Sequence, residues 1–151
     1  MDNDAQVGVL ETLTTTLIDS VNGYTEAAEN SENPRFKELF REHAGDRKQV
    51  VQSLQNEIRR LGGDPPDDGS FMGSTHQTWL DLKAAVTGRD DQRVINSVEA
   101  GEDYLKEKFE AALNSDELSG DARQAVERAY QSVRSGHDQV SRIKHQMEAN
   151  D

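Results

Sequence analysis

The chain contains no cysteine, and it is poor in proline, aromatic and apolar residues. The missing cysteines exclude disulfides, thiolate zinc sites and iron-sulfur clusters, and they are typical of a cytoplasmic protein. Only 33% of the residues are hydrophobic, which favours a narrow core surrounded by wide polar faces. The length of 151 residues suits a single domain over 1–151, with 1–4 and 149–151 expected to be disordered.

Long apolar runs and basic stripes are missing as well. No apolar run approaches the roughly 18 residues of a membrane-spanning helix, so we expect no membrane partner. A formal net charge of -12 repels phosphate backbones, and adjacent basic residues such as Arg59 and Arg60 sit among carboxylates. We therefore expect no nucleic-acid partner. The first residues are acidic where a secretory signal would be basic and then apolar, which again favours the cytoplasm.

Apolar residues recur at spacings of three and four, which predicts four long amphipathic helices and one short one. The predicted ranges are 5–29, 34–61, 74–87, 91–114 and 119–148. Asn33 and Pro34 supply an N-cap and a first-turn proline, and Gly62 and Gly63 end the second helix. The sequence thus predicts an all-α fold: a ferritin-like four-helix bundle with an additional short helix in the crossover between the second and third long helices. The direction of the third long helix stays open.

Four polar residues lie on or beside the apolar stripes near mid-height of their helices. His43 and Arg47 are in the stripe of the second helix, Glu102 is in that of 91–114, and His137 borders that of 119–148. A buried guanidinium needs a carboxylate partner, so we predict a polar layer in which Arg47 pairs with Glu102 and both histidines are hydrogen-bonded. The alternative is a metal site for iron, manganese or zinc formed by His43, Glu102 and His137.

The ligand pattern of a di-iron bundle is missing. Such a centre needs Glu-x-x-His on two helices and a glutamate on each of the other two. The four histidines are instead preceded, three positions earlier, by residues that are not carboxylates: Phe40, Gly73, Arg134 and Arg142. We therefore expect no catalytic residue and no resident cofactor, and we favour a non-enzymatic protein.

Glycines inside the predicted helices indicate close packing. Gly101 and Gly136 fall on or beside buried stripes, which predicts close backbone approach between 91–114 and 119–148. Gly23 and Gly45 fall on outward faces, where a second subunit could approach. We accordingly expect a homo-oligomer, such as a dimer, and a separate protein partner remains an open alternative.

His76 and Trp79 share one face of the short helix. This placement predicts a cap on the end of the bundle, and the alternative is that the two residues line a pocket.

Five stretches together resemble one known family: ETLTTTLIDSVNGYTEAAEN, LGGDP, GSTHQTWLDLKAAVTGRD, VEAGEDYLKEKFEAAL and ERAYQSVRSGHDQV. They are similar to a bacterial family of ferritin-like four-helix-bundle proteins of unknown function, domain-of-unknown-function family 2383. The resemblance covers about 9–143, and its most distinctive pieces are Gly73, His76 and Trp79 together with 101–103.

What this resemblance implies is a cytoplasmic bundle of the ferritin-like superfamily with a role in stress. It supplies no established reaction. The superfamily's metal ligands have no matching positions here, because Glu-x-x-His is missing. We therefore predict a non-enzymatic, stress-related helical bundle, and the alternative is a divergent metal-binding or iron-handling protein with a non-standard His/Glu site.

Overall fold

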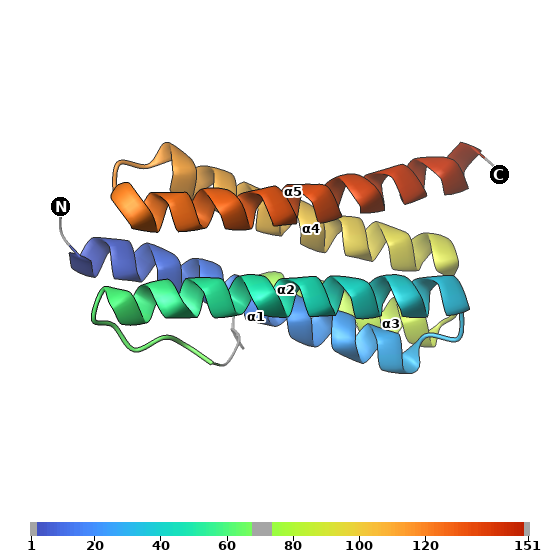
Figure 1. Cartoon of the computed structure of the whole chain (residues 1–151). Coiled ribbons are helices and arrows are strands. Elements are labelled where there is room, and N and C mark those ends of the chain that lie inside the picture. The colour runs from blue at the N-terminus through green and yellow to red at the C-terminus, as the bar shows by residue number, and fades with distance from the viewer. Residues whose placement is uncertain (1–2, 68–73, 150–151) are drawn as a thin grey trace.

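The computed structural model describes residues 3–67 and 74–149, with the backbone alone for 74–78 and 80. These residues form five α-helices and no strand (Figure 1): α1 (Asn3–Asn30), α2 (Pro34–Arg60), α3 (Ser74–Thr87), α4 (Asp91–Asn114) and α5 (Gly120–Ala149). The all-α prediction is confirmed, and each helix lies close to its expected range. Of the terminal residues that we expected to be disordered, 3, 4 and 149 are included in α1 and α5, and the others lie outside the described residues.

Helix ends follow the local signals in the sequence. The side chain of Asn33 accepts hydrogen bonds from the backbone N–H groups of Arg35 and Phe36, and Pro34 is the first residue of α2. After α2 the chain turns at Gly62, whose φ of 89° lies in the left-handed region that glycine adopts at low cost. These signals fix where α2 starts and stops.

The long helices run in the order up, down, down, up (Figure 1). α1 and α2 are antiparallel neighbours, α4 runs parallel to α2, and α5 returns antiparallel to α4. The segment between α2 and α4 must therefore cross the length of the bundle, and it contains α3, which packs against α1 and α4. A ferritin-like four-helix bundle with an additional short helix in the crossover fits this arrangement.

The apolar core is divided into two clusters along the bundle. One contains Leu17, Leu54 and Phe109, and the other contains Phe40 and Val98. The gap between the two clusters lies at the height of the polar layer that the sequence predicts. None of the helices in the described residues has both the length and the apolar content needed to cross a membrane.

Trp79 anchors α3 on the side of the bundle. Its side chain is 7% exposed and lies between two glycines, one on each neighbouring helix. A Cβ atom added at Gly23 of α1 or Gly101 of α4 would come within 2.5 Å or 2.9 Å of the indole ring. Both glycines are therefore needed for the close seating of Trp79.

The position of Trp79 shows that three predictions were wrong. Gly23 is buried under Trp79 and does not face outward, whereas Gly45 is exposed as expected. Gly101 makes room for α3 and not for α5. Trp79 packs on Gly23, Gly101 and Tyr24, beside the buried layer near mid-height of the bundle, so it does not cap the end of the bundle. The side chain of His76 lies outside the described residues.

Candidate functional site

A buried ion pair joins α2 to α4 between the two apolar clusters. Nη1 and Nη2 of Arg47 donate to Oε2 and Oε1 of Glu102 at 2.8 Å and 2.6 Å. The two side chains are 2% and 0% exposed. This parallel two-bond geometry is the strong form of the arginine–carboxylate pair, and it confirms the predicted pairing.

Tyr24 of α1 completes the hydrogen bonding of the carboxylate. Its hydroxyl donates to Oε2 of Glu102 at 2.8 Å, and the guanidinium of Arg47 lies 5.9 Å from the centre of its ring. Glu102 thus accepts three hydrogen bonds from two other helices. Residues of α1, α2 and α4 therefore meet in one layer, which ties the three helices together at one height.

His43 lies in the same layer but makes a different contact. It is 3% exposed, and its Nε2 lies 3.0 Å from Oε1 of Gln139 on α5. Its Nδ1 is buried without a hydrogen-bond partner among the described residues. The imidazole packs edge-on against Tyr24, with 5.1 Å between ring centres. His43 is accordingly a core histidine that links α2 to α5.

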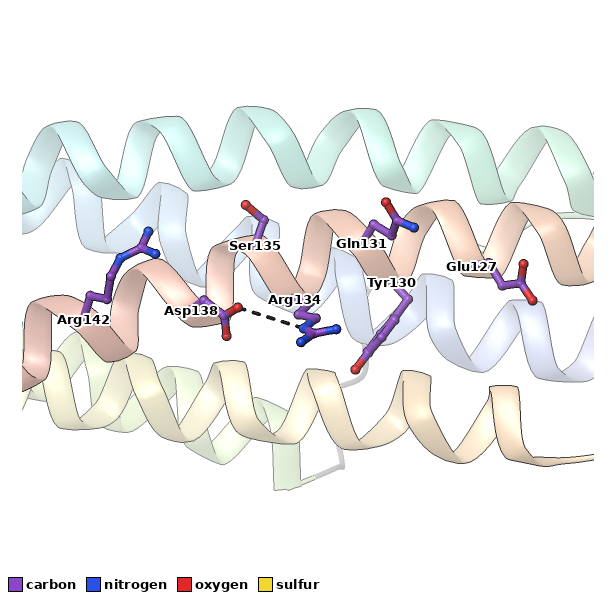
Figure 2. Close-up of a pocket in the computed structure, with 7 residues that line it drawn as sticks. All are labelled: Glu127, Tyr130, Gln131, Arg134, Ser135, Asp138 and Arg142. Atoms are coloured by element: carbon purple, nitrogen blue, oxygen red, sulfur yellow. Dashed lines mark ion pairs between the residues drawn. The ribbon is translucent and has the colours of Figure 1, made fainter.

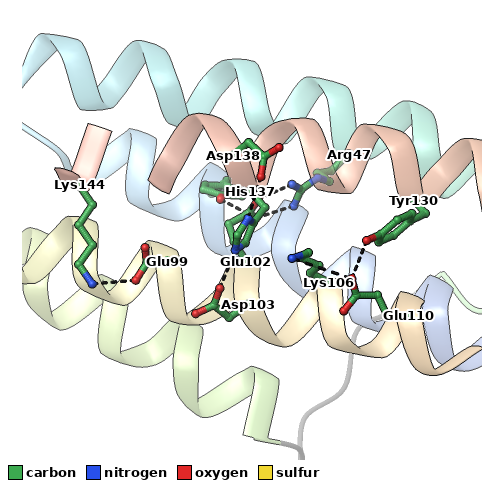
Figure 3. Close-up of polar contacts among 11 residues, drawn as sticks. Arg47, Glu99, Glu102, Asp103, Lys106, Glu110, Tyr130, His137, Asp138 and Lys144 are labelled. Carbon is green, nitrogen blue, oxygen red and sulfur yellow. Dashed lines mark hydrogen bonds and ion pairs between the residues drawn. The ribbon is translucent and has the colours of Figure 1, made fainter. Parts of the chain in front are cut away.

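His137 does not join the layer. Its Nε2 lies 2.7 Å from Oδ1 of Asp103, and its Nδ1 lies 3.3 Å from Oδ1 of Asp138. These contacts lie on the outer seam between α4 and α5, as Figure 3 shows beside the buried pair of Arg47 and Glu102. The four predicted residues therefore do not form one site.

Gly136 takes the inward position that His137 does not occupy. An added Cβ there would lie 2.6 Å from Nη2 of Arg47 and 3.2 Å from Oε1 of Glu102. One residue further along a helix is rotated by about 100°, which turns His137 away from the ion pair and towards Asp103. Gly136 therefore makes room for the side chains of Arg47 and Glu102, and not for the backbone of α4 as we predicted, and α5 closes the layer over the ion pair.

Burial and the interactions among the side chains determine the protonation states in the layer. Burial raises the pKa of Glu102, but the charge and hydrogen bonds of Arg47 outweigh it, so this pKa lies below its ordinary value. Burial raises the pKa of Tyr24 well above its ordinary value, and the charge of Glu102 raises it further. Near neutral pH the layer thus holds a guanidinium, a carboxylate and a neutral phenol. A general acid or base needs a pKa near the working pH so that it can gain and lose a proton, and these groups do not change their protonation there.

The metal alternative is not formed. Among the side chains that the structure describes, no group of three or more histidine, cysteine, aspartate or glutamate residues could hold a metal ion. Both oxygens of Glu102 accept hydrogen bonds from Arg47, a cation that opposes a second cation at the same place. His137 bonds to Asp103 and Asp138 on the seam between α4 and α5, so His43, Glu102 and His137 do not share a centre.

Figure 2 shows a depression on the outer side of α5. The residues that line it all come from α5, between Glu127 and Arg142, and they include the ion pair of Arg134 with Asp138 at 4.0 Å. None of them belongs to the buried layer. We place no site there.

The comparison with known families agrees with the sequence resemblance. A model of the family described as Domain of unknown function (DUF2383) matches residues 5–115. The chain belongs to this family. The match runs from α1 to the residue after α4, so it includes the three residues of the hydrogen-bonded ion pair, Tyr24, Arg47 and Glu102. No curated protein matches the chain.

The DUF2383 match ends before α5, which supplies Gly136 and Gln139 to the layer. Sequence reasoning missed both Tyr24 and Gln139 as members of the layer. The phenol was a usable signal, because a buried tyrosine hydroxyl usually has a hydrogen-bond partner. Gln139 offered no such signal, since a glutamine beside a helix stripe is commonly exposed.

We expect Gly136→Ala to lower the free energy of unfolding by about 1–2 kcal/mol. Crowding of Arg47, which Glu102 holds in place, costs about 1–3 kcal/mol, and the better helix propensity of alanine offsets up to about 1 kcal/mol of it. Gly45→Ala is the matched control on α2: no heavy atom lies within 4 Å of its added Cβ, so we expect a gain of about 0.5–1 kcal/mol. Urea denaturation measures both, and equal effects of the two substitutions would contradict the close approach of α5.

Proposed function

We propose that this protein is a non-enzymatic helical bundle of the cytoplasm that acts in stress physiology by binding other proteins, including further copies of itself. One observation carries the non-enzymatic part. The place between the helices where a ferritin-like bundle would hold two metal ions is occupied by Arg47, Glu102 and Tyr24. The three side chains are hydrogen-bonded to one another, so they leave no oxygen atom free to bind a metal ion in the core.

The other parts of the proposal have separate support. The complete lack of cysteine supports the cytoplasm, where disulfides are rare. The stress role is supported by the resemblance of the sequence to its family. Self-association is supported by the exposed Gly45, where a second copy could approach the backbone of α2. These three statements are inferences that need their own experiments.

The first experiment measures metal content and iron oxidation together. Protein purified without chelator or affinity tag is analysed by mass spectrometry for iron, manganese and zinc, and then mixed with ferrous iron under air. We expect less than stoichiometric metal and oxidation at the rate of buffer alone. Stoichiometric metal that is lost in His43→Asn, with circular dichroism unchanged, would replace this proposal with a metalloprotein.

A second experiment tests the physiological role. A strain without the gene is compared with its parent during osmotic, oxidative and acid challenge, with the gene restored on a plasmid. We expect slower growth under at least one challenge and recovery on restoration. Equal growth under all three would contradict the stress role.

Light scattering on the purified protein tests self-association. A measured mass equal to that of one chain at micromolar concentration would contradict it.

A further inference from the structure

The groove between α1 and α2 carries positive charge on an acidic protein. Its α2 side presents Lys37, Arg41 and Lys48, and its α1 side contributes a single carboxylate, Glu29. No ion pair joins any of these three cations to a carboxylate within the described parts of the chain. The whole chain has a formal net charge of -12. The groove is therefore a local exception to the charge of the molecule.

Apart from Glu29, four carboxylates near this groove face elsewhere or are already paired. Glu26 and Glu32 bind cations at 2.7 Å and 2.8 Å, supplied by Lys83 of α3 and by Arg89. Glu38 and Glu42 of α2 line a different groove, on the side of α5. On α2, Lys37, Arg41 and Lys48 thus face α1, while Glu38 and Glu42 lie with Arg35 on the side of α5.

Small residues form the floor of the groove. Ala28 and Ala44 are buried there, and Gly45 leaves open space above the backbone because no heavy atom lies within 4 Å of an added Cβ. The three cations stand at spacings of four and seven residues along one helix, so they span roughly 16 Å at 1.5 Å per residue. α1 and α2 lie side by side along this length (Figure 1). The result is a straight channel with a cationic wall.

We propose that this groove binds a short chain of phosphate groups, carried either by free condensed phosphate or by a nucleotide. Guanidinium and ammonium groups are the usual protein ligands of phosphate oxygens, and Arg41 stands between the two lysines. A single anion would contact only part of the row, whereas linked phosphates can contact all three cations. The acidic remainder of the surface restricts binding to this channel, because it repels long polyanions such as nucleic acids.

Calorimetric titration of the full chain with tripolyphosphate tests the proposal, in magnesium-free buffer at low and at physiological salt. We expect saturable binding that weakens with salt, as screened charge contacts do. Arg41→Gln is expected to weaken binding about tenfold, the effect of losing one charge-assisted hydrogen-bond donor. The matched control is Arg128→Gln, which removes an exposed cation of α5 and should leave the affinity within about twofold.

Gly45→Glu gives an independent test with little risk to folding, because its side chain has open space. The carboxylate should abolish binding without lowering Tm, while Gly45→Ala should retain binding. Tighter binding of tripolyphosphate than of ATP would identify free condensed phosphate as the source, and the reverse order would identify a nucleotide. No heat with either probe, equal weakening by Arg41→Gln and Arg128→Gln, or binding of a glutamate-rich peptide in place of both phosphates would overturn the proposal.

Discussion

Glu102→Ala is expected to lower the free energy of unfolding by about 3–5 kcal/mol, because it leaves a buried arginine without a counter-charge. The guanidinium of Arg47 is 2% exposed and loses both of its hydrogen bonds to the carboxylate. Tyr24 loses the acceptor of its hydroxyl in the same substitution. Urea denaturation at pH 7 measures the change, with the slope against urea checked for a two-state transition.

Glu99→Ala is the matched control for this loss. Glu99 lies on the same helix and pairs with Lys144 at 2.7 Å, but both side chains are partly exposed on the seam with α5 (Figure 3). We expect it to cost less than about 1 kcal/mol. The double variant Arg47→Met with Glu102→Leu removes both charges and should recover most of the stability. A similar loss in the two single Glu→Ala variants would show that burial adds nothing to the ion pair.

The pH dependence of stability gives a second view of the same layer. The pKa of Glu102 is lowered in the folded protein, so its contribution is complete above the ordinary value of 4.5 and is lost as pH falls through the lower folded value. The pKa of Tyr24 is raised, so its contribution is complete below the ordinary value of 10.0 and is lost as pH rises above it. The apolar double variant should therefore lose less stability than the wild type between pH 7 and pH 3.

Trp79→Ala is expected to lower the free energy of unfolding by about 3–5 kcal/mol, the usual cost of emptying a large aromatic site. The cavity would be bordered by Gly23 and Gly101, which have no side chains that could move in to fill it. The indole also packs on Tyr24, with 5.1 Å between ring centres, so the loss reaches the polar layer. Urea denaturation followed by circular dichroism measures the effect. Hydrogen exchange should show faster opening of α3 than of α1.

The substitution Gly23→Ala, made in the wild type and in Trp79→Ala, tests whether Trp79 packs on this glycine. Gly23→Ala places a methyl group within 2.5 Å of the indole and should cost about 1–3 kcal/mol in the wild type. In the Trp79→Ala background the same methyl enters empty space, so its cost should vanish or become a gain. Trp79 is the single tryptophan of the chain, and its emission should shift to longer wavelength in Gly23→Ala. If the free-energy costs of Gly23→Ala and Trp79→Ala are additive in the double variant, Trp79 does not pack on Gly23.

Much of the architecture was predictable because it depends on local patterns. The apolar period of 3.6 residues located the helices, and Asn33 with Pro34 located the start of α2. The pairing of Arg47 with Glu102 was also predictable. A charge on an apolar stripe must find an opposite charge, and both residues lie at mid-height whichever way their helices run.

Other features depend on contacts between helices that no local pattern describes. The period places Gly136 and His137 next to each other at the edge of a stripe, and only the position of α2 and α4 settles which of them faces the ion pair. Gly23 lies outside the apolar stripe of α1, so its burial becomes visible only when Trp79 of α3 is seen to cover it. The grouping of Lys37, Arg41 and Lys48 in one channel likewise needs the neighbouring helix α1.

The sequence by itself determined the all-α class, the number of long helices and the need for a buried ion pair, because hydrophobic period, capping and desolvation act within one helix or on one charge. Tertiary structure alone decided the direction of α4, the seat of α3 and the exclusion of His137 from the layer. The physical reason is that a helix pattern defines which face is buried but not which neighbour covers it. A crossover long enough to span the bundle allows more than one neighbour, and side-chain packing selects among them.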